Sequence, residues 1–335
     1  MNEVTQSPQG ELALAPQGRL AGLFPRKLGI SVVREYGIVA SFIAVFLILA
    51  FSSNVFLTKT NVLNMLDQTA PTGIMAVGGT LVFIAGGFDL SIGAVFAISG
   101  VLAAKAAPSL GPSLSLALGA LVGLGFGVLN GLLVTIGRIN AFIATLSTQL
   151  VIRGLAVAIT SGYLIVVTNP GFSHFGQGRA LGVTYGPWVW LIFALCAGVM
   201  LSRTSLGRFI YASGGNQEAA RLSGVRVPLV RAITFAISGF SASLAGVLIA
   251  SRVSTGQADA GTGIEFTVIA GIVIGGVSIF GGEGAIWRSV LGVLLLTMIG
   301  NGFNLLGINP IYSQVFQGGI ILLAVAVDSW SRRST

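Results

Sequence analysis

Three ionisable side chains stand inside long apolar runs of this sequence: Asp67, Asp89 and Arg153. A carboxylate beside a helix break can cap the next helix, or it can serve a gate or a solute path, because intramembrane charge is costly and often functional. Asp89 fits the first use if a helix begins at Leu90, with Ser91 in its first turn. A role in a gate or a solute path remains an alternative for both Asp67 and Asp89. Arg153 would cost roughly 2.5–3.5 kcal/mol at a bilayer centre, so we expect it to face other helices and pair with Asp67 or Asp89.

A polar island at residues 203–231 interrupts the apolar sequence, and its centre reads Glu-Ala-Ala-Arg-Leu-Ser-Gly at residues 218–224. The alanines favour a short helix, Gly215 and Asn216 can open it, and Gly224 can end it. Such a helix across the end of a bundle can transmit force to a soluble partner, whereas the alternative is an ordinary charged loop. Five of the 18 basic residues lie in this island: Arg203, Arg208, Arg221, Arg226 and Arg231.

The sequence offers few residues for disulfide, metal or nucleotide chemistry. With one cysteine, Cys196, and one histidine, His174, the sequence supports neither an intramolecular disulfide nor a Cys/His metal cluster. It contains no Gly-x-x-x-x-Gly-Lys-Ser/Thr phosphate loop, so another chain would have to bind and hydrolyse any ATP. The net charge of +8 comes from basic residues clustered between apolar runs, where membrane orientation and anionic lipid explain them. We therefore expect no metal, no cofactor in this chain and no nucleic acid partner.

The elements that would position these residues are transmembrane helices. Hydrophobic residues make up 54% of the 335 residues and charged residues only 8%, and the mean hydropathy is +0.91. A soluble domain has roughly 25% charged residues. Because lipid offers no hydrogen-bond partners to an open backbone, the predicted fold class is an all-α integral membrane bundle with broken or re-entrant segments.

Apolar runs long enough to span a bilayer predict about ten transmembrane helices, several of them short. Arg26, Lys27 and Arg34 precede the first run and place the amino terminus in the cytoplasm. An even number of spans returns the carboxyl terminus to the same side, together with 13 of the 18 basic residues. The predicted spans are residues 35–54, 63–86, 90–106, 114–136, 140–160, 187–202, 231–252, 264–281, 285–304 and 311–328.

The predicted organisation is one transmembrane domain between two cytoplasmic tails. A flexible tail occupies residues 1–33, the domain occupies 34–330 and includes the cytoplasmic loop 203–231, and a second tail occupies 331–335. Glycine pairs at residues 86–87 and 281–282 join apolar runs too closely for ordinary loops. Glycines at a spacing of four predict helix-packing stripes, with a smooth wall for a solute path as the alternative: Gly119, Gly123, Gly127 and Gly131, and again Gly271 and Gly275.

Four segments carry a family resemblance: Gly-Gly-Phe-Asp-Leu-Ser-Ile-Gly at 86–93, Asn-Ala-Phe-Ile-Ala-Thr-Leu at 140–146, Gly-Asn and Ala-Ala-Arg-Leu-Ser-Gly within 215–224, and Ile-Gly-Gly-Val-Ser then Gly-Gly within 274–282. Together they resemble the permeases of the ATP-binding-cassette importers for ribose, xylose and galactose. The resemblance covers nearly all of residues 60–328. Phe88 stands where this family leads us to expect Ile, and Ser147 where we expect Gly, and both departures bear on the substrate.

The resemblance implies a bacterial inner-membrane importer. Its parts would be two permease subunits in lipid, a cytoplasmic ATPase pair or fused double ATPase that binds the ATP, and a periplasmic sugar-binding protein. This chain would be one permease, and the Glu-Ala-Ala-x-x-x-Gly motif would fit a groove of the ATPase. The implied coupling residues are Glu218, Ala219, Ala220, Arg221, Leu222, Ser223 and Gly224.

A monosaccharide presents hydroxyl groups, so its path needs neutral donors and acceptors and aromatic faces more than fixed charge. Any such residue can equally form an interhelical hydrogen bond. His174 is expected in an outer loop, and Asp259 and Glu265 in or just beyond another, where they could contact the binding protein. The candidate pathway residues are Asp89, Asn130, Phe142, Gln149, Asn301 and Asn304.

Two other classes compete with an importer permease. A secondary transporter would more often place several ionisable groups in mid-membrane, and here there are few. An intramembrane enzyme would need histidines, paired carboxylates or an activated serine at usable spacing. The leading hypothesis is therefore an importer permease, for a monosaccharide or for another small polar solute such as a polyol, a nucleoside or an autoinducer. Neither the particular solute nor a homodimer as against a heterodimer of permeases follows from the sequence.

Overall fold

The computed structural model describes residues 26–309 together with residues 312, 315, 318, 319 and 322. Contacts divide the chain into two units, residues 1–37 and 38–335. Helix α1 (Arg26–Ser52) begins in the first unit and continues into the second. The predicted tail of residues 1–33 therefore overlaps the first eight residues of α1. Each residue added to an existing helix gains a hydrogen bond, so a spanning helix extends readily into its flanking residues.

The described part of the second unit is mainly helical, with two small antiparallel ribbons that join neighbouring loops. Strands β1 (Ile165–Val166) and β4 (Thr255–Gly256) pair, as do β2 (Arg179–Ala180) and β3 (Val183–Thr184). The remaining helices are α2 (Lys59–Ile84), α3 (Ile92–Thr135), α4 (Ala141–Thr160), α5 (Pro170–Gln177), α6 (Tyr185–Arg203), α7 (Ser205–Gly215), α8 (Gln217–Leu222), α9 (Val227–Val253), α10 (Ile264–Ile274) and α11 (Ile286–Leu305).

Among the described helices, α3, α4, α6, α9 and α11 are long and apolar enough to cross a bilayer. The third and fourth predicted spans form the two arms of α3, which bends at Gly111, where φ is +74°. Pro108 and Pro112 flank this bend, and a proline inside a helix removes a backbone hydrogen bond and kinks it. The helices themselves were predicted, and the connection between these two spans was not.

Two other predicted spans differ from the structure. The eighth, residues 264–281, was predicted too long, because α10 ends at Ile274 and is followed by Gly275 and Gly276, the latter with φ +79°. The tenth, residues 311–328, falls largely outside the described residues. The described helices therefore do not establish the predicted count of ten spans.

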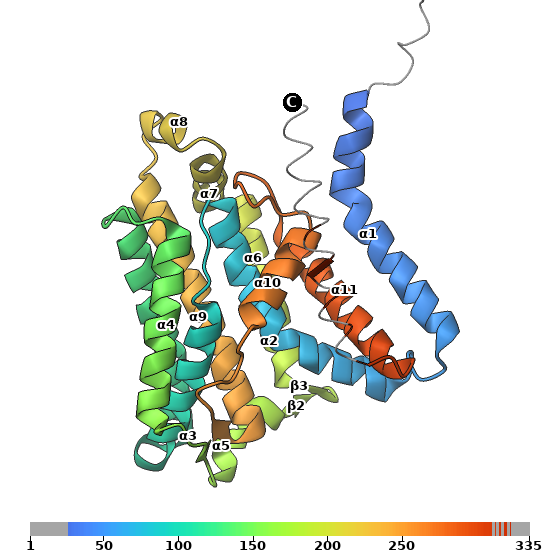
Figure 1. Cartoon of the computed structure of the whole chain (residues 1–335), viewed down its shortest axis with the longest axis vertical. Helices are drawn as coiled ribbons and strands as arrows, with labels where there is room; N and C mark the ends of the chain where they lie inside the picture. Colours follow the sequence, from blue (N-terminus) through green and yellow to red (C-terminus); the bar gives the residue numbers. More distant parts are fainter. Residues whose placement is uncertain (1–25, 310–311, 313–314, 316–317, 320–321, 323–335) are drawn as a thin grey trace, which may run out of the picture. The chain divides into compact units, whose positions relative to one another are not determined.

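The two ends of the second unit carry different segments (Figure 1). Helices α7 and α8, which form the polar island, lie at one end, whereas α5 and the β2–β3 ribbon lie at the other. The outer loop expected around His174 therefore contains α5 and the β2–β3 ribbon. This separation agrees with the expectation that the island and the stretch around His174 belong to opposite sides of a membrane.

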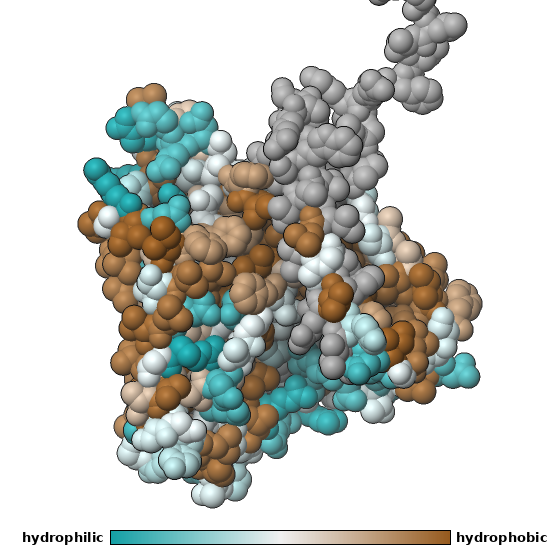
Figure 2. Space-filling model, in the orientation of Figure 1, coloured by the Kyte–Doolittle hydropathy of each residue, from teal (hydrophilic) through white to brown (hydrophobic). Residues whose placement is uncertain are grey.

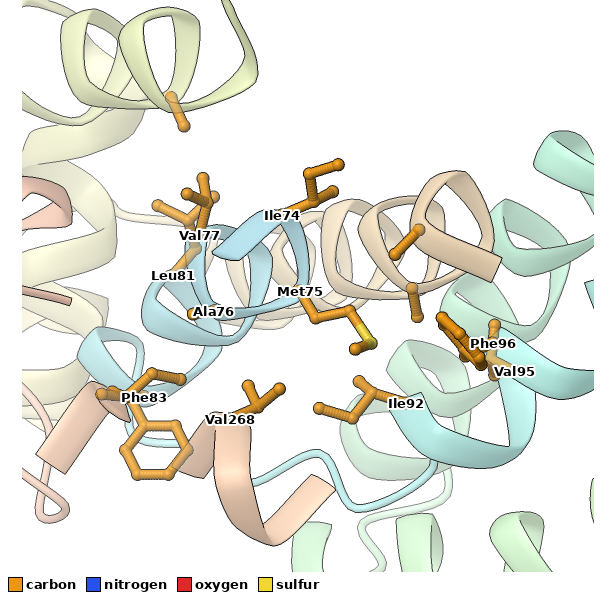
Figure 3. Packing of buried hydrophobic residues seen from close by; sticks show 14 of the residues in the cluster. Ile74, Met75, Ala76, Val77, Leu81, Phe83, Ile92, Val95, Phe96 and Val268 are labelled. Atoms are coloured by element: carbon orange, nitrogen blue, oxygen red, sulfur yellow. The ribbon is translucent and has the colours of Figure 1, made fainter. Parts of the chain in front are cut away.

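The packed core lies where α2, α3, α9 and α10 meet. Figure 3 shows Met75 of α2 pointing toward Ile92 and Phe96 of α3, with Val268 of α10 beside Ile92. Apolar side chains also cover much of the outside of α4 and α6. A helix that is apolar on its inner and outer faces alike is expected where lipid replaces water.

The glycine stripe of the fourth predicted span packs against α9. A Cβ at Gly123 would overlap the carbonyl of Gly239, and one at Gly127 would overlap the carbonyl of Phe235. Glycine therefore lets the two backbones touch. Gly271 and Gly275 make the same kind of contact between α10 and α11, where Cβ atoms would overlap Val293 and Arg288. The packing interpretation of both stripes is confirmed.

Candidate functional site

The first helix break, residues 85–91, runs through the interior between α2 and α3. Gly86 has φ +74°, and the Gly87 N–H returns to the carbonyl of Val82 at 2.9 Å, which ends α2. A Cβ at Gly87 would lie 3.0 Å from Val82 and 3.2 Å from Phe235, so this backbone is tightly enclosed. Helix α3 resumes at Ile92, two residues after the predicted start. An irregular segment inside a membrane bundle is tolerated when protein surrounds it.

Asp89 is the centre of a buried hydrogen-bond network. Its Oδ1 accepts the Ser91 N–H at 3.0 Å and the Ser91 hydroxyl at 2.6 Å, and its Oδ2 accepts the Ser238 hydroxyl of α9 at 2.8 Å. Asn130 Nδ2 donates to the Ser91 hydroxyl at 2.8 Å, while Asn130 Oδ1 is buried without a partner among the described residues. The network ties the break to both arms of α3 and to α9.

Thr145 joins α4 to the same break. Its hydroxyl accepts the Leu90 N–H at 3.1 Å and lies 2.8 Å from the carbonyl of Ala141, one turn earlier in α4. The Leu90 N–H belongs to the non-helical segment, and without Thr145 it would be a buried donor in need of a partner. Residues on three helices therefore satisfy the polar groups of this break.

A replacement of Asp89 by alanine is expected to lower the unfolding temperature of the protein in detergent. Alanine leaves the Ser91 and Ser238 hydroxyls buried without their acceptor, at about 1–3 kcal/mol for each unsatisfied group. Asp89→Asn keeps one acceptor oxygen and should lose less. A thermal melt of the three proteins checks the order, and equal melting of Asp89→Ala and wild type would contradict it. Normal stability of Asp89→Asn with lost uptake would instead favour a role in the solute path.

A second polar cluster lies at the start of α3 and involves α4 and α10. Gln149 Nε2 donates to Glu265 Oε1 at 2.8 Å, and Glu265 is 3% exposed. Arg153 Nη1 donates to the carbonyls of Ala258 and Ala260 at 2.6 and 3.0 Å. Glu265 lies just beyond the loop before α10, as expected, but it is buried among α3, α4 and α10 and so is not exposed for contact with a partner. The expected partners of Arg153 were wrong, since backbone carbonyls hold its guanidinium.

Asp67 forms an ion pair with Arg252 rather than with Arg153. Its Oδ2 lies 3.5 Å from Arg252 Nη2, Arg252 Nη1 also donates to the Asp67 carbonyl at 3.2 Å, and the Thr184 hydroxyl donates to Asp67 Oδ1. These bonds join α2 to the end of α9 and to β3. Neither Asp67 nor Asp89 is therefore available to Arg153.

The second helix break, residues 275–285, touches the first. The Gly282 N–H donates to the carbonyl of Ile84 at 2.9 Å, and a Cβ at Gly281 would lie 2.9 Å from Gly86 Cα. The end of α7 completes this contact, because a Cβ at Gly214 would overlap the Ile84 carbonyl and the Tyr211 hydroxyl donates to the Gly284 carbonyl at 2.7 Å. We call this meeting point the glycine junction: Gly86, Gly214, Gly281 and Gly282.

The motif of the polar island forms the short helix α8, next to the glycine junction. Asn216 Oδ1 accepts the Ala219 N–H at 2.9 Å and caps it, and Gly224 follows its end with φ +85°. Ala220 is buried at 5%, whereas Leu222 is 76% exposed. One face of α8 is thus anchored on the bundle and the other is free.

Glu218 and Arg221 form an exposed ion pair on α8, with Arg221 Nη2 2.5 Å from Glu218 Oε1. The hydrogen bond and the positive charge of Arg221 hold the pKa of Glu218 below its ordinary value. Glu218 is therefore ionised at neutral pH. Its side chain is available to a partner on the exposed face of the island.

A cavity of about 770 Å³ opens between α8, the first break and the start of α4. Arg231 of α9 lines it and donates to the Gly86 carbonyl at 3.1 Å. Phe142 also lines it, with its ring centroid 6.5 Å from that of Phe88. The cavity therefore lies beside both α8 and the first helix break.

The structure brings together some of the candidate pathway residues and separates others. Asp89 and Asn130 share one network, and Gln149 lies in the second cluster. Asn301 instead exchanges two hydrogen bonds with Asn61 of α2, at 2.8 and 3.1 Å, and Asn304 is exposed near the end of α11. The sequence analysis did not identify Ser238, Gly214 or Tyr211, and only Ser238 gave a signal, as a polar residue in the apolar run of α9.

Broken helices inside an apolar bundle, with carboxylates buried at a helix start, define a multi-pass membrane transport protein. A family model described as branched-chain amino acid transport system / permease component matches residues 61–325, and the chain belongs to this permease family. The ribose import permease protein RbsC of Escherichia coli (strain K12) is 39% identical over 306 residues, which are 89% of this chain and 94% of that protein.

Other relatives have similar coverage. The ribose import permease protein RbsC of Bacillus subtilis (strain 168) is 40% identical over 276 residues, or 82% of this chain and 86% of the relative. The L-arabinose transport system permease protein AraH of Escherichia coli (strain K12) is 35% identical over 302 residues, or 90% and 92%. No solved structure matched this chain.

Proposed function

We propose that this chain is the translocation subunit of an ATP-binding-cassette importer for a monosaccharide. Permeases named for ribose and L-arabinose import are 39% and 35% identical to it along nearly their whole lengths, which supports the sugar class. A periplasmic binding protein would deliver the sugar, and a cytoplasmic ATPase subunit would bind the ATP. A second permease subunit, a copy or a relative, would complete the path through the bacterial inner membrane.

The observation that carries this proposal is the placement of α8. It presents an ionised Glu218 and an exposed Leu222 on its free face, while its start adjoins the glycine junction. A partner that moved α8 would therefore press on the backbones of both helix breaks. This arrangement is expected when a soluble ATPase subunit drives conformational change in a membrane permease. It also supports a cytoplasmic position for the island, and an even number of spans would place both termini on that same side.

The direct test is uptake by the assembled importer in proteoliposomes. With its ATPase and binding protein, the chain is expected to accumulate D-ribose, L-arabinose or D-allose only when ATP is supplied. L-leucine tests the solute named in the family description and should not be taken up. The chain alone should hydrolyse no ATP. Leucine uptake without sugar uptake would overturn the sugar class, and ATP turnover by the chain alone would overturn its place in the assembly.

A further inference from the structure

Glu265 is a buried carboxylate with an unused acceptor. Its Oε1 accepts the Gln149 amide, but its Oε2 is buried and has no hydrogen-bond partner among the described residues. Burying a charged acceptor without a hydrogen bond is strongly unfavourable. Such an atom calls for a specific explanation, because buried polar atoms are almost always paired. A bound molecule with a hydroxyl donor would supply the missing bond.

The surrounding elements hold this carboxylate in place. A Cβ at Gly93 would overlap Oε2, so the carboxylate rests directly on the first turn of α3, where backbone N–H groups favour negative charge. Arg153 of α4 acts on Glu265 electrostatically while it holds the two carbonyls before α10. Elements α3, α4 and α10 thus fix Glu265 without occupying Oε2.

The cluster also reaches the surface of the second unit. Gln149 and Arg153 are half-buried, whereas Leu150 and Val151 between them are 70% and 61% exposed. Figure 2 shows hydrophilic patches between α4 and α10, next to the largely hydrophobic surface of α4. Polar surface at bilayer depth is unfavourable against lipid and is found where it lines a water-filled path or meets another subunit.

We propose that Glu265 and Gln149 bind hydroxyl groups of the transported sugar, on the α4–α10 side of the path. Glu265 Oε2 accepts one sugar hydroxyl, and the Gln149 carbonyl oxygen accepts a second. This inference rests on the proposed function, because it names residues that recognise the solute of a sugar importer.

The local charges favour a neutral, hydroxylated ligand. Arg153 already offsets the charge of Glu265, so an added cation or ammonium group would meet the guanidinium. An added anion or carboxylate would meet Glu265 itself. A sugar hydroxyl satisfies Oε2 without adding charge, which distinguishes a monosaccharide from an amino acid at this position.

The test combines changes in the protein with changes in the sugar. Uptake of D-ribose and of its singly deoxygenated analogues is measured in proteoliposomes for wild type, Glu265→Leu and Glu265→Gln. A hydrogen bond to a charged group contributes a factor of about 10 to 100, so Glu265→Leu should lower ribose uptake by about that factor. One deoxy analogue should be transported equally by wild type and Glu265→Leu, because the hydroxyl that Glu265 binds is already missing. Glu265→Gln, which keeps an acceptor oxygen, should lose less.

The control is Thr297→Val in α11, whose hydroxyl bonds to the carbonyl of Val293 in its own helix. It should leave uptake of every sugar unchanged. A Glu265→Leu effect that is the same for ribose and for all its analogues, or no effect, overturns the inference while the proposed function stands. Absence of any sugar uptake by the wild-type assembly overturns the proposed function instead.

A labelling experiment keeps the inference testable if Glu265→Leu does not fold. Cys196 is the one cysteine of the sequence, so Cys196→Ser gives a background for introduced thiols. A membrane-impermeant methanethiosulfonate reagent should modify Gln149→Cys faster than Val151→Cys, because a thiol in water ionises and one in lipid does not. Equal rates would overturn the placement of Gln149 on an aqueous path.

Discussion

Gly214→Ala is expected to abolish ATP-driven uptake and to lower the unfolding temperature in detergent, whereas Gly215→Ala should leave both close to wild type. A Cβ at Gly214 would overlap the Ile84 carbonyl and lie 2.7 Å from the Gly282 nitrogen. Both obstacles are backbone, so neither can move aside as a side chain would. Overpacking of this kind typically costs about 1–3 kcal/mol. A Cβ at Gly215 would meet only Gly282 Cα, at an ordinary 3.9 Å.

The expected loss of uptake follows from what Gly214 connects. It lies at the end of α7, two residues before the Asn216 cap of α8, and it touches the end of α2 and the second break at once. Uptake of ribose by the reconstituted importer and a thermal melt of each variant provide the measurement. If Gly214→Ala melted and transported like Gly215→Ala, the glycine junction would carry neither stability nor coupling. If it melted normally but did not transport, the junction would serve coupling alone.

The helices could be predicted because a membrane requires long apolar runs and the sequence displays them openly. The residues around the motif at 218–224 also predicted where its helix begins and ends. The structure has a helix there, capped by Asn216 and followed by Gly224. The spacing of Gly119 and Gly123 identified a packing face without naming the partner, α9. Such local patterns can be read from the sequence because they depend only on residues that are neighbours in the chain.

The contacts across the bundle could not be predicted in the same way. Arg153 is held by the carbonyls of Ala258 and Ala260, and every residue has a carbonyl, so no sequence pattern identifies these two. Sequence position placed Glu265 beside an outer loop, but the fold of the segment before α10 turns it inward against Gly93. The glycine junction depends on three segments far apart in the chain, so the sequence indicated two helix breaks, at residues 86–87 and 281–282, but not that they meet at Gly214.

Glu218→Lys is expected to reduce ATP-driven uptake by at least about tenfold while the protein folds and inserts normally. The Glu218–Arg221 pair is fully exposed, and such pairs contribute little to folding. The change therefore acts on whatever the free face of α8 contacts, which in the proposed importer is a groove of the ATPase. Reversing one charge at an interface is expected to weaken binding by about a factor of 10 or more. Uptake rates and the amount of ATPase that co-purifies with the permease measure the effect.

Arg208→Glu provides the matched control, since it reverses one exposed charge on the neighbouring helix α7, where Arg208 Nη2 donates to the Ser205 hydroxyl. It should leave uptake near wild type if coupling belongs to α8 in particular.

A companion change, Gly224→Val, should also stop uptake, because φ +85° strains a β-branched residue although nothing else lies within 4 Å of the added Cβ. Equal losses from Glu218→Lys and Arg208→Glu would mean that the island acts through its overall charge. Full transport by Glu218→Lys and Gly224→Val would show that α8 does not couple the ATPase to transport. Movement of α8 would then not be what acts on the glycine junction.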